Sequence, residues 1–244
     1  MSKLISLCDG HGMETAGKRS PNGMRENEFN SRVVYWLDII LRHNGFRTLL
    51  VAPTEKDTLL EVRTDISNAK GADLYLSIHA NAHLGKWGNA RGVETFYYSG
   101  SKDGKRLADI LQKYLLKGTA QINRGVKHTK NLHVLSETKC VAALIEAAFM
   151  DNHEEAELLK TETFRVECAT EIAQAVCEYY GITFKPYQKL EPKPITPIKQ
   201  GNKVLHRVIV NGKQIGAYDL VTNISKQVED AIKSGAKEIK IEKV

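Results

Sequence analysis

One stretch of sequence decides the fold: Ala72-Asp73-Leu74-Tyr75-Leu76-Ser77-Ile78-His79-Ala80-Asn81. Its centre, residues 74–78, is a short and mostly apolar run of the kind that forms a buried strand. His79 follows this run directly, and open α/β sheets place their ligands at the carboxyl edge of such strands. A histidine in that position is either a structural side chain or part of a functional site, and the other predicted strands bear on the choice.

Similar apolar runs alternate with helical patterns on both sides of this stretch. In the range 26–43, for example, Phe29, Val33 and Leu37 recur at helical spacing, and Gly45 ends the pattern. We expect strands at 4–7, 46–52, 74–78, 92–98 and 141–145, and helices at 26–43, 59–69, 103–117 and within 154–180. Strands that alternate with helices predict an α/β fold, with a twisted, mostly parallel or mixed sheet covered by helices on both faces.

The composition is that of an ordinary globular protein, with 42% hydrophobic and 26% charged residues in a chain of 244. No run approaches the roughly 18 to 20 apolar residues of a membrane span, so we expect no membrane insertion. The first residues enter a short strand without the apolar segment of a signal peptide. The four cysteines form no CxxC pair. Both features indicate synthesis in a reducing cytoplasm.

The last quarter of the chain has the features of a linker and a small module. Four of the six prolines fall at 186, 192, 194 and 197, and this spacing excludes a helix or a central strand. We therefore expect a domain at 1–182, a proline-rich linker at 183–202 and a module at 203–244. In that module Asn211-Gly212 predicts a hairpin between strands 204–210 and 214–218, followed by a helix at 223–235 and a strand at 238–244. The result is a ββαβ arrangement.

The net charge of +6 lies entirely in this C-terminal part. Residues 183–244 contain 12 Lys/Arg and 6 Asp/Glu, whereas residues 1–182 contain 23 of each. A basic segment on a neutral domain indicates a polyanionic partner, such as nucleic acid, anionic lipid or an acidic wall polymer, or else a solubilising tail. Nucleic acid is disfavoured because only Tyr187 and Tyr218 offer stacking surfaces in the final 60 residues.

Potential metal ligands follow the predicted strands. His11 lies in a glycine-flanked loop after strand 4–7, and His79 follows strand 74–78. Glu26 begins the first long helix. A zinc ion that hydrolyses amides needs three such ligands and one open position. Glu146 follows a buried strand, where a carboxylate is costly without a partner, and beside a metal it can serve as a general base.

The spacing alone leaves alternatives open. His11 and Glu14 form an HxxE pattern, so Glu14 competes with Glu26 as a ligand. Cys8 lies three residues before His11, which makes a Cys/His nucleophile pair conceivable, although Cys8 fits better as the inward end of the first strand. The other histidines are expected at the surface, in caps or in loops, and two of them, His128 and His133, are candidates to line a cleft.

These residues resemble the zinc-dependent N-acetylmuramoyl-L-alanine amidases of bacterial autolysins and phage endolysins. The resemblance covers most of residues 3–181. It rests on the following motifs: Asp9-Gly10-His11-Gly12, Glu26 with Asn30, Arg63 and Asn68, Ser77-Ile78-His79-Ala80-Asn81, Gly92-Val93-Glu94-Thr95, Asn123-Arg124-Gly125-Val126-Lys127, and Leu144-Ile145-Glu146 with Phe149 and Asn152. Two departures are Met13, where the family usually has Gly, and Val141, near which it often has Pro. The C-terminal part resembles the small ββαβ wall-binding modules of endolysins.

The resemblance implies a site and a reaction. By it, His11, Glu26 and His79 bind one zinc ion, which favours Glu26 over Glu14, and Glu146 is the catalytic residue. The implied reaction hydrolyses the amide between N-acetylmuramic acid and L-alanine in peptidoglycan and lyses the cell wall. The residues expected to contact substrate or support the site are Ser77, Asn81, Arg63 and Arg124.

Two other functions fit the same sequence less closely. One is a zinc peptidase that cuts within the peptidoglycan stem peptide, and the other is a wall-binding protein without activity. The expected partners are peptidoglycan and acidic wall polymers. Since we see no export signal, we expect the protein to reach the wall after release through a holin or on lysis of the cell. The sequence leaves phage or bacterial origin and oligomeric state open.

Overall fold

The computed structural model describes residues 2–52, 56–118, 121–188, 206–211, 213–218 and 239–243. The chain divides into two compact units, Met1–Tyr187 and Gln188–Val244, which are described separately. Among the described residues, none of the helices combines the length and the apolar character needed to span a membrane.

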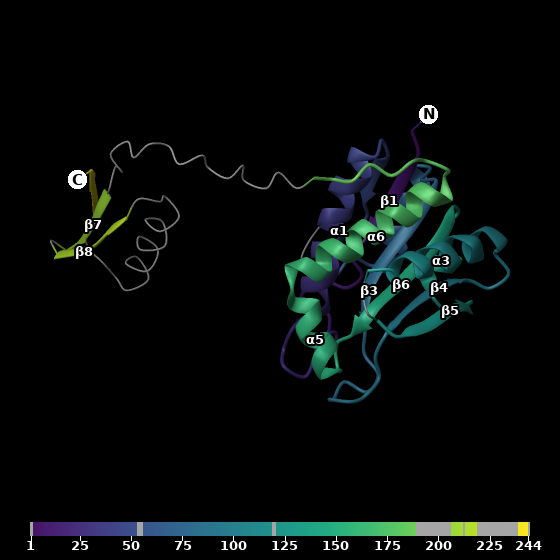
Figure 1. Ribbon diagram of the computed structural model, residues 1–244, viewed down its shortest axis with the longest axis horizontal. Helices are drawn as coiled ribbons and strands as arrows, with labels where there is room; N and C mark the ends of the chain where they lie inside the picture. Colours follow the sequence, from purple (N-terminus) through teal and green to yellow (C-terminus); the bar gives the residue numbers. More distant parts are fainter. Residues whose placement is uncertain are drawn as a thin grey trace. The chain divides into compact units, whose positions relative to one another are not determined.

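The first unit is built on a mixed six-stranded sheet with the strand order β2-β1-β3-β6-β4-β5 (Figure 1). Its strands are β1 Leu4–Cys8, β2 Arg47–Leu50, β3 Leu74–Asn81, β4 Val93–Tyr98, β5 Asn123–Thr129 and β6 Val141–Phe149. The first three and β6 run parallel to one another, whereas β4 pairs with β6 in antiparallel fashion and β5 runs parallel to β4. The predicted α/β fold with a mixed sheet is therefore confirmed.

Helices cover both faces of this sheet. One face carries α1 Glu26–His43, α3 Lys102–Leu115, α5 His153–Lys160 and α6 Glu162–Tyr179. Figure 1 shows α1, α3 and α6 lying across the same side of the strands. The opposite face carries α2 Leu60–Ala69 and the single turn α4 His133–Ser136. The sequence predicts α1 and α2 closely and does not predict α4.

The alternation of β3 decides which face holds the site. Leu74, Leu76 and Ile78 point into the larger core beneath α1 and α6. Tyr75 belongs to the smaller core beneath α2 and α4. Because successive side chains of a strand point to opposite faces, His79 lies on the face of Tyr75, under the smaller helical layer. The face covered by four helices thus supplies most of the apolar burial, at about 1.5–3 kcal/mol per large side chain. His79 points to the other face, which has fewer helices.

The two central strands are longer than their apolar runs predict. We expected His79 and Glu146 to follow their strands, but both lie within them, since β3 continues to Asn81 and β6 to Phe149. The two residues are register partners in the parallel ladder between these strands. Pairing between these two strands, at His79 with Glu146 and at Asn81 with Phe149, therefore extends each strand past its predicted apolar run.

The second unit contains three described strands in the order β8-β7-β9, all antiparallel. They are β7 His206–Val210, β8 Lys213–Tyr218 and β9 Ile239–Lys243. Asn211 has a φ of 49°, as a tight Asn-Gly hairpin requires. The predicted helix at 223–235 and most of the predicted linker lie outside the described residues.

The chain just after α6 belongs to the first unit. The backbone N–H of Lys185 donates to Asn44 Oδ1 at 2.7 Å, and Asn44 Nδ2 donates back to the Lys185 carbonyl at 3.1 Å. The Tyr187 ring lies edge-on to His43, with centroids 5.5 Å apart. These contacts hold residues 185–187 against the end of α1.

Candidate active site

The loop between β1 and α1 carries the first candidate ligand, His11. Two side chains from other elements fix this loop. Asn27 Nδ2 donates to the His11 carbonyl at 2.7 Å, and the buried Arg63 guanidinium donates to the carbonyl of Gly10. Gly10 itself has a φ of 66°, and a Cβ added there would lie 2.7 Å from the His79 ring. The loop therefore approaches β3 as closely as only glycine permits.

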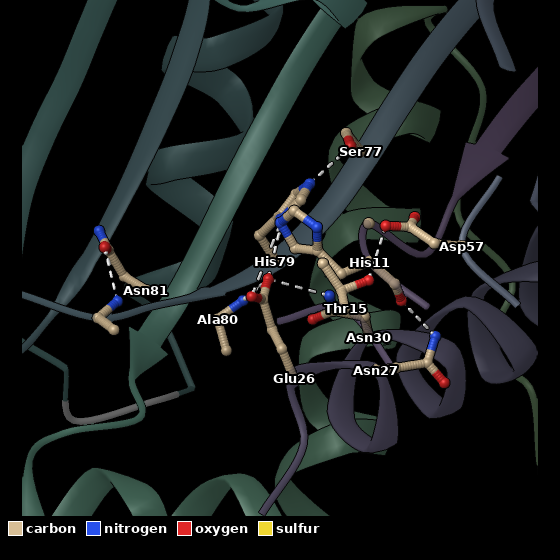
Figure 2. A network of polar contacts seen from close by, with 12 residues as sticks. His11, Thr15, Glu26, Asn27, Asn30, Asp57, Ser77, His79, Ala80 and Asn81 are labelled. Carbon is tan, nitrogen blue, oxygen red and sulfur yellow. Dashed lines mark hydrogen bonds and ion pairs between the residues drawn. The ribbon is translucent and has the colours of Figure 1, made fainter. Parts of the chain in front are cut away.

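The second and third candidate ligands, Glu26 and His79, meet directly (Figure 2). Glu26 is the first residue of α1 and is 2% exposed. Its Oε1 lies 2.8 Å from His79 Nδ1 and also accepts from Asn30 Nδ2 at 3.2 Å and from the Ala80 N–H at 3.3 Å. The other imidazole nitrogen, His79 Nε2, lies 3.0 Å from Ser77 Oγ. Both ring nitrogens of His79 are thus oriented by named partners.

His11 completes a three-residue cluster. Its Nε2 lies 3.9 Å from Glu26 Oε2, and its ring centroid lies 5.1 Å from that of His79. One ligand atom from each of the three residues falls within 4.8 Å of the other two. Two imidazoles and one carboxylate are the donor set of many catalytic zinc sites. The residues present therefore fit a zinc ion with an open position.

The charges of the cluster are those of an ion pair beside a neutral imidazole. Burial acts against ionisation of both Glu26 and His79, but their mutual hydrogen bond and charge keep the pKa of Glu26 below its ordinary value and the pKa of His79 above it. Burial lowers the pKa of His11 to about 4, so its ring is neutral at pH 7. A neutral imidazole has the free lone pair that a metal requires.

Glu146 stands beside this cluster on the neighbouring strand. It pairs in register with His79 on one side and with Glu94 on the other. Its Oε2 is buried and has no hydrogen-bond partner among the described residues. Burial, with added repulsion from the Glu26 and Glu94 carboxylates, raises the pKa of Glu146 to about 8. A buried carboxyl group whose Oε2 has no partner in the described part of the chain, and whose pKa is raised toward neutrality, suits proton transfer.

The cluster and Glu146 open into one cleft of about 230 Å³. Its polar side includes the cluster, Lys18 and Glu146. Its apolar side is formed by Leu60, Leu132, Val134 and Leu144, next to His133. A second hollow of about 510 Å³ lies between α1 and β2 and is lined by none of the three ligands or Glu146. We take the smaller cleft as the candidate active site, because the titratable groups converge there.

Comparison with known proteins agrees with this geometry. The sequence model of the family described as N-acetylmuramoyl-L-alanine amidase matches residues 5–178, which is most of the chain. The chain belongs to the N-acetylmuramoyl-L-alanine amidase family. Membership supports peptidoglycan amidase activity, and the matched range contains every residue of the cluster.

Individual relatives are similar over the same part of this amidase. N-Acetylmuramoyl-L-alanine amidase CwlM of Bacillus licheniformis is 32% identical over 182 residues, which cover 73% of this chain and 69% of the relative. The endolysin of Bacillus phage SPP1 is 32% identical over 206 residues, or 80% of this chain and 73% of the relative. Among solved structures, the catalytic domain of CwlV from Paenibacillus polymyxa has a TM-score of 0.69 and 26% identity, covering 74% of this chain and 99% of that domain.

The alternatives to the cluster residues lie elsewhere in the amidase. The Glu14 side chain is 78% exposed and pairs with Arg25 at 2.6 Å, outside the cluster. Cys8 is buried at the end of β1, where its sulfur accepts from Arg63 Nη1 at 3.4 Å. His128 lies at 3.1 Å from Ser99 Oγ and does not line the cleft, whereas His133 does.

Besides Ser77, three residues were expected to contact substrate or support the site, and they have different surroundings. Arg63 is 2% exposed and donates to the carbonyls of Gly10 and Thr58 and to Asp57. Asn81 Nδ2 donates to Glu94 Oε1 at 2.9 Å. Arg124 is partly exposed, and its Nε donates to Glu94 Oε2 at 2.7 Å. Arg63 is thus tied to the protein backbone, while Arg124 reaches the surface.

Sequence reasoning assigned no role to Glu94, Lys127 or Lys18. The first two lie in motifs that carry the family resemblance, Gly92–Thr95 and Asn123–Lys127, so their positions were visible but their contacts were not. Lys18 lies in the His11 loop and carries no local signal in the sequence. Only the folded loop brings it to the cleft.

Proposed function

We propose that this chain is a zinc-dependent amidase that cleaves the amide between N-acetylmuramic acid and L-alanine in peptidoglycan. The observation that carries the proposal is the convergence of His11, Glu26 and His79 beside Glu146, whose buried Oε2 has no partner among the residues that the structure describes. Three ligands and an adjacent base are the requirements of metal-assisted amide hydrolysis.

His11, Glu26 and His79 would hold the metal. When bound, a zinc ion supplies a Lewis acid that polarises the substrate carbonyl and lowers the pKa of a water molecule. Glu146 accepts a proton from the attacking water and delivers it to the departing nitrogen of L-alanine. Because Glu146 lines the same cleft as the cluster, one carboxyl group can perform both transfers in turn.

Other side chains prepare this site. Ser77 holds the outer nitrogen of His79, and Asn30 holds the Glu26 carboxylate, so the ligands are oriented before metal binds. We propose that Arg63 positions the His11 loop through the Gly10 carbonyl, which its burial favours over contact with substrate. Asn81 and Arg124 remain proposed substrate-side residues.

Digestion of purified peptidoglycan tests the reaction. We expect new N-terminal L-alanine and lactyl ends on intact glycan chains. New termini within the stem peptide would instead establish the zinc peptidase. Binding without any new termini, unchanged in the Glu146→Gln variant, would establish a wall-binding protein without activity.

Metal analysis tests the cofactor separately. We expect one zinc ion per purified chain and its loss in His79→Ala, with circular dichroism as the check on folding. A chain that retains zinc after loss of His79, or that never contains it, would contradict the proposed ligand set.

The C-terminal unit is proposed to bind the cell wall. Its support is the excess positive charge of residues 183–244, which would attract acidic wall polymers. Removal of residues 188–244 keeps the contact between Lys185 and Asn44. Sedimentation of the full and shortened chains with isolated walls decides the point, because unchanged binding would refute this role. The proposed place of action is the wall, reached after release from the cell.

A further inference from the structure

A buried carboxylate holds two cations next to the active site. Glu94 is 4% exposed, and its Oε1 accepts from Asn81. Its Oε2 accepts from Arg124 Nε at 2.7 Å and from Lys127 Nζ at 2.5 Å. These hydrogen bonds and charges outweigh the effect of burial and keep the pKa of Glu94 below its ordinary value. One negative charge thus faces two positive charges.

Both cations are fixed in place and yet reach solvent. The Arg124 guanidinium lies 4.7 Å from the centroid of the Phe149 ring, and Lys127 Nζ lies 5.6 Å from that of Phe96. Their side chains remain 34% and 39% exposed. Contacts with an aromatic face and a buried carboxylate reduce the freedom of long cationic side chains. The pair is therefore ordered before any ligand arrives.

The strand register relates this pair to the catalytic carboxyl. Glu94 is the register partner of Glu146, so both side chains leave the same face of the sheet on adjacent strands. Neighbouring strands lie about 4.8 Å apart. Arg124 and Lys127 belong to β5, the next strand outward, and reach back to Glu94. The two cationic groups thus end about one strand spacing from the strand of Glu146.

We propose that Arg124 and Lys127 bind a carboxylate on the peptide side of the substrate, with Glu94 as the positioning residue beneath them. This inference rests on the proposed amidase function and extends it to substrate selection. An ordered pair with one net positive charge favours an anion over a neutral amide, and the guanidinium fork suits a carboxylate. The two cationic groups end about one strand spacing from the strand of Glu146. That separation suits a carboxylate within about one or two residues of the cleaved bond, at roughly 3.5 Å per residue.

The test uses two muramoyl peptides that differ in one group. In one, the second residue of the peptide carries a free carboxylate, and in the other the same position carries a carboxamide. For the wild-type full-length chain we expect kcat/KM to be about 10-fold or more higher with the carboxylate, mainly through KM. Arg124→Gln and Lys127→Gln should each remove most of this preference while still cleaving the carboxamide substrate.

The controls separate substrate selection from folding and from catalysis. Lys130→Gln alters an exposed lysine just after β5 and should leave the preference unchanged. Glu94→Gln should weaken the preference because the cations lose their anchor. Equal kcat/KM of the wild-type chain for the two substrates would overturn the proposal, and so would a preference that survives both Arg124→Gln and Lys127→Gln. Cleavage of neither substrate would instead refute the amidase function itself.

Discussion

His79 and Glu146 are direct register partners on the parallel strands β3 and β6. Paired residues of adjacent strands leave the same face of a sheet, with their strands about 4.8 Å apart. A candidate metal ligand and the candidate base are therefore fixed side by side by backbone hydrogen bonds. No loop movement is needed to bring them together, and this rigidity underlies the predictions that follow.

Replacement of Glu146 by Gln should separate catalysis from metal binding. The amide preserves the size of the side chain but accepts no proton, so we expect kcat to fall by about 10²–10⁴-fold. Zinc content should stay at the wild-type level because Glu146 is not part of the ligand cluster. Release of L-alanine ends and metal content, measured on the same preparation, check both expectations. Retention of full activity would remove Glu146 from the mechanism.

The metal-free protein should become less stable as the pH rises, because the Glu146 carboxyl resists ionisation in the folded state. The Glu146 carboxyl has a pKa of about 8 when folded against an ordinary value of 4.5. Between these values the unfolded chain releases a proton that the folded chain retains, so each rise in pH favours unfolding. By pH 8 the effect on the free energy of unfolding reaches roughly 4 kcal/mol.

Glu146→Gln provides the matched measurement, because it removes this titration. The melting temperatures of the two metal-free proteins should lie close together near pH 4.5. As the pH approaches 8, the melting temperature of the variant should rise above that of the wild type. A difference that stays constant across this range would show that Glu146 titrates as an ordinary exposed carboxylate.

The site was predictable from sequence to the extent that its residues sit at the ends of regular patterns. The apolar periodicity of residues 26–43 predicted α1 with Glu26 at its start, and the run 74–78 predicted the strand that carries His79. The choice between Glu14 and Glu26 was not predictable from spacing. It depends on the direction of the Gly10–Arg25 loop, which tertiary contacts of Arg63 and Asn27 determine.

Strand β5 illustrates what the sequence could not predict. Its residues, Asn123–Thr129, are mostly polar and contain no apolar run, because an edge strand buries little of its surface. The antiparallel direction of β4 is likewise absent from any local pattern, since the alternation of strands and helices favours parallel pairing. Pairing with β6 sets the direction of β4, and pairing with β4 sets the place of β5. Together they create the contact of Arg124 and Lys127 with Glu94.

Arg63 should stabilise the fold and the metal site together. Arg63→Met would leave the carbonyls of Gly10 and Thr58 without their guanidinium donor, at a cost of about 3 kcal/mol. Zinc affinity should fall as well, because the His11 loop loses its support. The matched control is Arg42→Met. The Arg42 side chain is 61% exposed and pairs with Asp38, so removing this pair should cost less than about 1 kcal/mol of folding stability. Denaturant unfolding and zinc titration of both variants test this, and equal costs would contradict a special role for Arg63.

The close approach of the His11 loop to β3 can be tested with two glycines of the same loop. Gly10 and Gly17 both have positive φ, 66° and 75°, so alanine is strained by a similar amount at either position, about 1–2 kcal/mol. A Cβ on Gly17 meets no atom within 4 Å, whereas one on Gly10 lies 2.7 Å from both the His79 ring and Asn30 Nδ2. Only Gly10→Ala therefore displaces a candidate ligand and the side chain that holds Glu26.

We expect Gly10→Ala to weaken zinc binding by about 10- to 100-fold, as loss of the groups that support metal ligands commonly does. Gly17→Ala introduces the backbone strain without the clash, so it should lower the melting temperature by less than Gly10→Ala does and leave zinc affinity near the wild-type value. Zinc titration of the two variants at equal protein concentration makes the comparison, with the melting curves as the measure of shared strain. If both variants bound zinc alike, the approach of Gly10 to His79 would have no part in forming the metal site, and the loop would act only by carrying His11.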